Sequence, residues 1–344
     1  MEARSLNGEY FSRRLWHRLM GERVYPKDAI WLRQRRPRLL HSHFGYVALS
    51  DFELHNFLEV PWLVSFYGAD VYQQMRLQVW QERYFRLFSQ VDLVLALGPE
   101  MATQLESLGC PRKKIVVHPL GVDIDALPNS PRVLQPGSPL RVLFAGTFRE
   151  KKGIEYVLQG VAKARKCGVR LQVTLVGDAS DKPGDLSTKE SISREIKQLG
   201  VEDIVTHYPF LKFDELVRLA MQSHVFLAPS VTGEDGDAEG TPFVVQQMMA
   251  TGMPVIATLH SDIPYIFGEH EYQLVPERDS AAIARRLEQY ADEPERLVID
   301  GTALRERIRT VFDVRTCAAR LSEIYDVTQA GGTFLTNGGG ENSQ

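Results

Sequence analysis

Two turns in this sequence carry side chains that could hold a charged ligand. In the first, Phe144–Gly153 (FAGTFREKKG), an apolar run enters a glycine-containing turn with Arg149 and Lys152. Backbone amides and a lysine in such a turn suit phosphate groups. In the second, Glu234–Pro242 (EDGDAEGTP), acidic residues lead into an apolar run. Together the turns predict a site for an oxygen-rich anion, with a merely solvated basic turn as the alternative for the first.

The residues after the acidic turn predict a helix and then a buried strand. We expect Thr241 as the N-cap, Pro242 as the first helical residue and Gly252 as the helix stop. Unpaired N–H groups and the positive end of the helix dipole suit a sugar diphosphate. Glu239, just before this helix, can accept hydrogen bonds from sugar hydroxyls. The alternative is a capped core helix with an incidental glutamate.

The acidic turn also allows two metal-site interpretations. Asp235 and Asp237 form a D-x-D pair, and they fall in register with the start of an EF-hand loop. The EF-hand pattern fails at its twelfth position, where Gln246 stands in place of Glu, and the segment turns helical too early. We expect a solvated acidic loop without a metal.

The elements that must position these turns follow an α/β rhythm, because short apolar runs alternate with stretches of helical period. The predicted strands are Arg38–His43, Trp62–Phe66, Asp92–Ala96, Ile115–His118, Leu140–Ala145, Leu171–Val176, Ile204–His207, Val225–Ala228, Pro254–Ala257 and Tyr272–Val275. The predicted helices are Val47–Phe57, Val71–Phe88, Glu100–Leu108, Gly153–Lys166, Lys189–Leu199, Phe213–Gln222, Pro242–Thr251, Ser280–Ala291, Glu295–Thr310 and Asp313–Val327.

The proline-rich stretch Pro128–Pro139 divides the chain, since proline fits neither a central strand nor a helix interior. We predict one Rossmann-like domain over residues 1–130, a linker over 131–139 and a second Rossmann-like domain over 140–310. Residues 311–328 are expected to form a helix that packs back toward the first domain, and residues 329–344 a disordered tail. Two such domains bind ligands in the cleft at the carboxyl ends of their strands.

Composition excludes several classes of protein. The formal net charge of -4 argues against a nucleic-acid-coating protein. The three cysteines are far apart without a CxxC pair, which argues against a disulfide scaffold and favours the reducing cytoplasm. No apolar run approaches the ~20 residues of a membrane span. The basic residues 13–38 either rest on an anionic membrane surface, at the inner face of the cell membrane, or form a solvated helix.

The stretch that begins at Glu239 resembles the signature of family-4 retaining glycosyltransferases, notably those that build bacterial exopolysaccharides such as colanic acid. In that family the Glu of an E-G-x-P motif contacts the donor sugar, which implies this role for Glu239, with Gly240, Thr241 and Pro242 beside it. A second Glu, eight residues later, holds the nucleotide ribose. Gln247 stands at that position and can still exchange hydrogen bonds with a ribose diol.

The basic turn resembles the family's G-R-x-x-x-x-K-G loop, in which Arg and Lys clamp the donor diphosphate. Gly146 and Lys152 match that loop, whereas Thr147 stands at the Arg position. Arg149 is the nearest guanidinium and is expected to substitute. Cationic stabilisation of the departing diphosphate is then the main catalytic effect, so Glu239, Lys152 and Arg149 are the predicted catalytic residues.

Two weaker matches complete the implied nucleotide site. Gly177, in the segment LVGD, resembles a strand-end glycine that approaches the nucleotide. The pair Phe210-Leu211 occupies the place where backbone atoms of the family meet the base. Each of these two matches is as compatible with a structural role as with a functional one.

Two strand ends of the first half resemble the family's H-x-H-F and T-F-H-G-x-D segments. They are HSHFG at residues 41–45 and SFYGAD at residues 65–70, and they imply His43, Tyr67 and Asp70 on the acceptor side. Tyr67 stands where the family's His contacts the reacting centre, and tyrosine is a poor base near neutrality. A retaining mechanism in which the acceptor attacks from the front face needs little enzymatic base, because an oxygen of the leaving group takes the acceptor proton. A satisfied core histidine is the alternative for His43.

The resemblance covers residues 38–328 and implies the GT-B fold, an α/β architecture of two Rossmann-like domains facing across a cleft. The N-terminal domain is shortened, because the family's first strand and Gly-rich acceptor loop have no counterpart in residues 1–37. Either the acceptor site is incomplete or the start of the sequence is truncated.

The expected function is transfer of a sugar, with retention, from a UDP- or GDP-sugar to a glycan or polyprenyl-linked acceptor. The nucleotide-sugar is a substrate, and neither a cofactor nor a metal is expected. One alternative is a catalytically weak or inactive relative that binds nucleotide-sugar or a partner, which the departures Tyr67, Thr147 and Gln247 favour. The other, an NAD(P)-dependent oxidoreductase, lacks a G-x-G-x-x-G motif.

Overall fold

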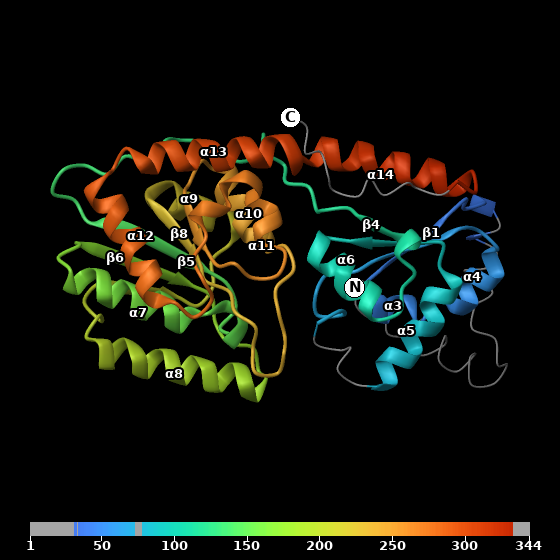
Figure 1. Ribbon diagram of the computed structural model, residues 1–344, viewed down its shortest axis with the longest axis horizontal. Coiled ribbons are helices and arrows are strands. Elements are labelled where there is room, and N and C mark those ends of the chain that lie inside the picture. The colour runs from blue at the N-terminus through green and yellow to red at the C-terminus, as the bar shows by residue number, and fades with distance from the viewer. Residues whose placement is uncertain (1–30, 33, 73–77, 333–344) are drawn as a thin grey trace, which may run out of the picture.

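The computed structural model describes residues 31–32, 34–72 and 78–332 of the chain. These residues form two parallel sheets, each covered by helices (Figure 1). Residues 128–139, between the last strand of the first sheet and the first strand of the second, form neither helix nor strand. Most of the basic segment 13–38, residues 73–77 of a predicted helix and most of the predicted tail lie outside the described residues.

The first sheet has the strand order β1-β2-β3-β4, and every neighbouring pair is parallel. Its strands are short apolar runs, and the two central ones are buried along their whole length, as in a sheet covered on both faces. The elements of this half are β1 (Leu40–His43), α3 (Gly45–Ala48), α4 (Phe52–Leu58), β2 (Trp62–Ser65), α5 (Gln78–Gln90), β3 (Leu93–Ala96), α6 (Pro99–Ser107), η2 (Arg112–Lys114) and β4 (Ile115–Val117).

The second sheet has the order β7-β6-β5-β8-β9, again with parallel pairs. From the central β5 the chain first builds outward to β7, then returns to β8 on the other side. Its strands are β5 (Leu140–Ala145), β6 (Leu171–Val176), β7 (Val205–Tyr208), β8 (Val225–Ala228) and β9 (Val255–Ala257). The loops after β5 and β8 therefore leave in opposite directions, and such a switch point opens a crevice at the carboxyl ends of the strands.

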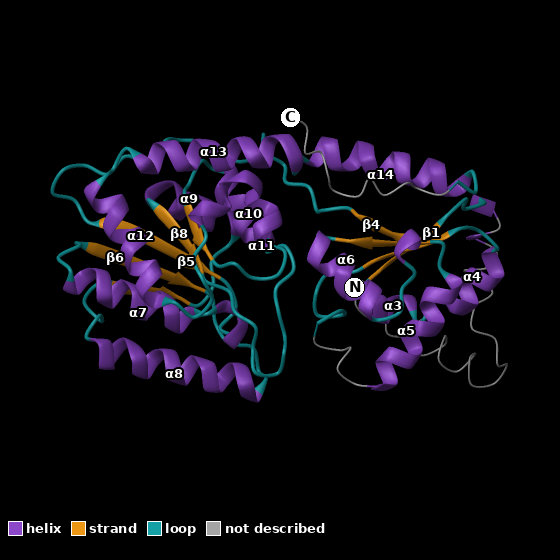
Figure 2. Ribbon diagram, in the orientation of Figure 1, coloured by secondary structure: helices purple, strands orange, loops and turns teal. Residues whose placement is uncertain are grey.

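Helices cover both faces of the second sheet (Figure 2). On one face α7, α8 and α12 supply apolar side chains to the core, and on the other α10, α11 and α13 do so. The elements of this half, besides the strands, are η3 (Glu150–Lys152), α7 (Ile154–Lys166), α8 (Pro183–Leu199), α9 (Phe213–Gln222), α10 (Phe243–Ala250), α11 (Ile263–Phe267), η4 (Gly268–Gln273), α12 (Ser280–Asp292), α13 (Arg296–Val311) and α14 (Val314–Gln329).

The last helix, α14, returns to the first sheet. Figure 1 shows α13 lying along the second half and α14 continuing over the first. Ile324 of α14 is fully buried against Leu63 and Leu93 on the face of the first sheet opposite its main core. The chain enters this helix beside Gly121, where an added Cβ would lie 2.5 Å from the Cα of Val314. In the described part of the chain, no helix combines the length and apolar character needed to span a bilayer.

Most predicted elements are confirmed, and four differ. Of the predicted helix Val71–Phe88, Val71 and Tyr72 lie in a turn, and the helix α5 covers Gln78–Gln90. β5, β6 and β8 have the predicted bounds, because each is an apolar run closed by turn residues. The predicted strand Tyr272–Val275 is wrong: the chain forms the short helix η4 there, and Val275 contributes only a single bridge to Thr258. The predicted helix Val47–Phe57 is divided into α3 and α4. The helix predicted from Lys189 begins earlier, at Pro183, whose ring fits a first helical position.

The packing of α13 on the turn after α10 predicts a sharp requirement for Gly301. A Cβ at this position would lie 2.2 Å from the carbonyl oxygen of Gly252. We expect Gly301→Ala to lower the free energy of unfolding by about 1–3 kcal/mol, the usual cost of overpacking. Gly184→Ala in α8 is the matched control, because a Cβ there meets nothing within 4 Å. Urea denaturation measures both, and equal stability of the two variants would contradict this packing.

Candidate functional site

The turn after β5 is shaped by Gly153, which lies between η3 and α7. Its φ of +62° is left-handed, and a Cβ there would come within 1.9 Å of the carbonyl oxygen of Pro229. The turn is therefore packed directly on the start of the loop after β8. The backbone N–H of Val231 also donates to the carbonyl oxygen of Lys151 at 2.9 Å. These contacts hold the basic turn against the acidic one at the switch point of the sheet.

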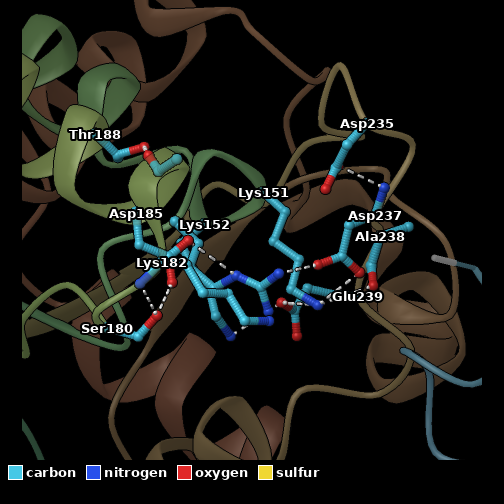
Figure 3. Close-up of polar contacts among 12 residues, drawn as sticks. Lys151, Lys152, Ser180, Lys182, Asp185, Thr188, Asp235, Asp237, Ala238 and Glu239 are labelled. Atoms are coloured by element: carbon cyan, nitrogen blue, oxygen red, sulfur yellow. Dashed lines mark hydrogen bonds and ion pairs between the residues drawn. The ribbon is translucent and has the colours of Figure 1, made fainter. Parts of the chain in front are cut away.

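Three cations of the basic turn meet carboxylates of the acidic turn. The Lys152 Nζ lies 3.0 Å from the Glu239 Oε1, and the Lys151 Nζ lies 3.3 Å from the same oxygen. Lys151 also contacts the Asp237 Oδ1 at 3.1 Å. The Arg149 Nη2 lies 2.8 Å from the Asp237 Oδ2. Figure 3 shows both lysines extending toward the loop that carries Asp237 and Glu239.

A third carboxylate reaches this group from the helix α8. The Asp185 Oδ1 lies 3.4 Å from the Arg149 Nε, and the Ser180 hydroxyl donates to the other Asp185 oxygen at 2.5 Å. Arg149, Lys151 and Lys152 therefore face Asp185, Asp237 and Glu239, and we call these six residues the charge cluster. Its formal charge is zero when every member is ionised.

Burial makes the pairing essential for the acidic members of the charge cluster. Asp237 is 2% exposed and Glu239 7% exposed. Burial opposes the ionisation of Glu239, but the ammonium groups of Lys152 and Lys151 outweigh it and hold its pKa below the usual range. Glu239 is therefore a carboxylate at neutral pH, able to accept hydrogen bonds.

A histidine fixes the backbone at Glu239. The backbone N–H of Glu239 donates to the His260 Nε2 at 3.1 Å, and the other ring nitrogen, Nδ1, lies 2.5 Å from the Glu277 Oε1. Nε2 must accept the first bond, so the proton sits on Nδ1 and is donated to Glu277. The His260 ring is buried. This chain of bonds orients the residue that carries the predicted donor contact.

The start of α10 differs from the prediction in one residue. Pro242, not Thr241, is the N-cap, and Phe243 is the first helical residue. The carbonyl oxygen of Pro242 already accepts the backbone N–H of Val245 at 3.0 Å, which is the mark of an N-cap. Thr241 precedes the helix, and its buried hydroxyl has no hydrogen-bond partner among the described residues. The side chain of Pro242 itself makes no capping hydrogen bond. Gln247, one turn on, is half-buried.

The remaining predicted nucleotide contacts lie at the ends of neighbouring strands. Gly177, with φ +132°, follows β6, and a Cβ there would lie 1.9 Å from the carbonyl oxygen of Gly146, which follows β5. Thr147, next to Gly146, is exposed. After β7, Phe210 is 79% exposed while Leu211 is half-buried against the core. The structure thus brings Gly146, Thr147 and Gly177 together. Phe210 follows β7, which is an edge strand of the sheet.

The predicted acceptor-side residues divide into two kinds. His43 is exposed, and its Nδ1 lies 2.5 Å from the Tyr67 hydroxyl. The backbone of Tyr67 lies near the second half, because its carbonyl oxygen is 3.9 Å from the position of a Cβ on Gly240. Asp70, in contrast, is fully buried and accepts from the backbone N–H groups of Gly45, Tyr67 and Gly68. Asp70 can therefore act on an acceptor only by shaping the turn.

The loop after β9 joins the two halves at the edge of the cleft. Asp262 accepts from the backbone N–H groups of Glu100 and Met101 at 2.7 and 3.0 Å, so a residue of the second half caps α6 of the first. The hydroxyls of Tyr72 and Ser261 lie 2.9 Å apart. A cavity of about 530 Å³ lies beside these contacts. Its lining includes Tyr72 of the first half and Ala238 and His260 of the second, and Ala238 is the neighbour of Glu239.

Sequence reasoning missed Lys151, Asp185, His260 and Asp262. The doubled lysine at 151–152 was a usable signal, since either side chain could have faced the acidic turn. The others pair with residues far away in the sequence, and no local pattern marks them. Among the described residues no three or more His, Cys, Asp or Glu are grouped to hold a metal ion. Independence from metal remains a prediction.

Two family models match the chain. The family model "Glycosyl transferases group 1" matches residues 128–308, and the model "Glycosyltransferase Family 4" matches residues 8–126. The chain belongs to the glycosyl transferases group 1 family. The match to this family spans the second sheet together with both turns of the charge cluster.

Two relatives of the chain carry names from colanic acid and amylovoran biosynthesis. A protein of Escherichia coli K12, named as a colanic acid biosynthesis glycosyltransferase, is 32% identical over 72% of the chain and 59% of its own length. The amylovoran biosynthesis glycosyltransferase of Erwinia amylovora is 30% identical over 83% of the chain and 69% of its own. The chain thus spans under two thirds of the first relative.

Solved glycosyltransferase structures share the fold. Sucrose-phosphate synthase from Thermosynechococcus elongatus superimposes with a TM-score of 0.73 at 19% identity, covering 88% of the chain and 76% of its own. Anabaena HepE in complex with UDP superimposes with a TM-score of 0.74 at 16% identity, covering 87% and 81%. The predicted GT-B architecture of the chain is therefore confirmed.

The lowered pKa of Glu239 predicts how its contribution to stability changes with pH. A carboxylate whose pKa is depressed in the folded state stabilises the protein above its unfolded pKa, and this contribution is lost as the pH falls through the folded value. We expect Glu239→Gln to be less stable than wild type at pH 7, with the difference shrinking steadily as the pH falls below about 4.5. Urea denaturation across this range measures it, and a pH-independent difference would contradict the ionised pairing.

Asp262 predicts the opposite dependence for the contact between the halves. Burial raises its pKa to about 6, although the two backbone hydrogen bonds lower it. Opening the cleft returns Asp262 to water, where a carboxyl titrates near 3.9. Closing therefore takes up a proton between these values, and the closed form weakens as the pH rises through 6. We expect the radius of gyration from X-ray scattering to increase from pH 5 to pH 7.5.

Two variants test whether Asp262 is the cause. Asp262→Asn cannot titrate, so the change in radius between these two pH values should vanish. Asp214→Asn, an exposed carboxyl in the first turn of α9, is the matched control and should behave as wild type. A radius that still changes in Asp262→Asn would assign the effect to another group.

Proposed function

We propose that this protein transfers a sugar, with retention, from a UDP- or GDP-sugar to a glycan or a polyprenyl-linked glycan precursor. One observation carries the proposal: Lys152 and Lys151 converge on Glu239 at the switch point of the second sheet, immediately before the uncapped N-terminus of α10. Cations and unpaired backbone N–H groups at one place suit a diphosphate. A carboxylate among them suits the hydroxyls of the attached sugar.

On the donor side, each residue has a role that its position allows. Lys152 and Arg149 neutralise the diphosphate as it departs, and this electrostatic stabilisation lowers the barrier. Glu239 orients the donor sugar by accepting hydrogen bonds from its hydroxyls. Gln247 binds the ribose, and the backbone at Gly146 and Gly177 lets the nucleotide approach the strand ends, where no Cβ is present. The backbone at Phe210 and Leu211 binds the base.

The sugar is then transferred on the side of the donor site that faces the first half. The bond between the anomeric carbon and the diphosphate oxygen breaks, and the acceptor oxygen bonds to that carbon on the same face. The acceptor proton passes to the departing oxygen. Tyr67 keeps its own proton, because burial raises the pKa of its hydroxyl. It therefore serves as a hydrogen-bonding group and not as the base.

The relatives and the structural neighbours support this proposal. The E. coli and Erwinia proteins are named for colanic acid and amylovoran biosynthesis, and both products are exopolysaccharides. Anabaena HepE, which shares the fold, has been crystallised with UDP and with UDP-glucose.

We propose that this chain works on the cytoplasmic side of the cell membrane, without a metal or other cofactor. Its basic leading segment would contact anionic lipid near a lipid-linked acceptor.

Calorimetric titration with UDP and GDP, with and without a chelator, tests the donor site. We expect one nucleotide to bind in both conditions, and Lys152→Met to weaken binding about tenfold or more, as the loss of a charge-assisted contact predicts. Lys166→Met, exposed at the end of α7, is the matched control. NMR of the product should show the anomeric configuration of the donor.

Three results would contradict the proposal. They are the absence of binding by both nucleotides, a signal that the chelator abolishes, and a product of inverted configuration. The first excludes the donor site, the second excludes the metal-free mechanism, and the third excludes retention.

A further inference from the structure

The charge cluster contains a competitor for the ligand it would bind. Arg149 is the cation that has to replace the family's missing arginine on the diphosphate. In the structure its guanidinium is held by Asp237 at 2.8 Å and by Asp185 at 3.4 Å. Both carboxylates lie where they neutralise the cation that the diphosphate needs.

Each carboxylate oxygen of Asp237 has a cation beside it. One of its oxygens contacts Arg149, and the other lies 3.1 Å from the Lys151 Nζ. The side chain is 3% exposed, so water screens these contacts little. The backbone holds it in place as well: the Asp237 N–H donates to the Asp235 Oδ1 at 2.9 Å, and its carbonyl oxygen accepts from Gly233 at 2.9 Å.

Charge balance shows what this pairing does to an incoming diphosphate. The charge cluster is neutral, and a nucleoside diphosphate adds two or more negative charges. If both carboxylates stayed on Arg149, the new anion would meet a guanidinium that is already compensated, next to two carboxylates that repel it. The diphosphate therefore has to exchange with a carboxylate, which moves away or yields its cation.

We propose that Asp237 is a positioning residue that occupies Arg149 and Lys151 in place of the diphosphate and thereby sets the affinity for the nucleotide. With the site empty, Asp237 keeps the two cations ordered and their charge compensated. With the donor bound, it yields Arg149 to the diphosphate. After transfer, it returns and helps to displace the nucleoside diphosphate product. This inference rests on the proposed function and adds to it a control of product release.

Asp237→Asn tests this competition, with UDP as the titrated probe. The amide keeps an oxygen for Arg149 or Lys151 but removes the negative charge, so we expect UDP to bind about tenfold more tightly, the change that corresponds to one ion pair. Binding should also weaken more steeply with added salt than in wild type. The KM for the donor should fall, and inhibition by UDP should increase.

Three further variants separate competition from general effects. Asp235→Asn makes the same change in charge two residues away and keeps an oxygen for the Asp237 N–H, so UDP affinity should change little. Asp185→Asn removes the more distant carboxylate on Arg149 and should tighten binding by a smaller factor. This variant also keeps the test open if Asp237→Asn does not fold. In an Arg149→Ala background, Asp237→Asn should tighten binding less than in wild type.

The outcomes distinguish this inference from the proposed function. Weaker or unchanged UDP binding by Asp237→Asn, with wild type binding normally, overturns the competition and leaves the transferase proposal intact. Equal tightening by Asp235→Asn also overturns it, because the effect would then be one of net charge. Absence of UDP and GDP binding by wild type overturns both proposals.

Discussion

The mutual compensation of three cations and three carboxylates is the constraint on which the site depends. Asp237 and Glu239 are almost fully buried, and a buried carboxylate persists only where hydrogen bonds and opposite charges offset the loss of water. Arg149, Lys151 and Lys152 provide that offset. The same cations are the groups that can bind a diphosphate. The carboxylates therefore stand where anionic groups of the donor are expected.

The topology of the second sheet makes this compensation possible. The two turns follow β5 and β8, which are neighbours in the sheet although about eighty residues separate them in sequence. Gly153 lets the first turn pack on the backbone at Pro229, where any side chain would clash. Asp262 adds a link to the first half by capping α6. The loops after β8 and β9 thus join the donor site to the contact between the halves, because His260 contacts the Glu239 backbone and Asp262 caps α6.

The sequence predicted the parts of the molecule that local patterns specify. Apolar runs bounded by turn residues predicted β5, β6 and β8 to the residue, and the resemblance around Glu239 and Lys152 predicted the GT-B fold, which the structural neighbours confirm. The strand at Tyr272–Val275 was wrong because its first residues belong to η4 and only Val275 pairs with the chain beside β9, through a single bridge. The predicted N-cap at Thr241 was wrong. Proline has no backbone N–H to donate, but its carbonyl oxygen can accept the first hydrogen bond of the helix, so Pro242 is the N-cap.

Local sequence patterns could not predict which residues pair across long distances in the sequence. The partners of Asp237 lie more than eighty positions away, and Asp262 meets α6 across more than 160 positions. A single sequence does not show which of many charged residues meet in space. Arg149 was expected to face a diphosphate, and it does lie at the predicted turn. Its two carboxylate partners became visible only in the folded chain.

A crystal structure of the protein with UDP bound tests the central claim most directly. We expect the diphosphate within hydrogen-bonding distance of Lys152 and Arg149, near the start of α10, with Arg149 separated from at least one of Asp185 and Asp237. A diphosphate bound elsewhere, or bound here with every contact of the charge cluster unchanged, would contradict it.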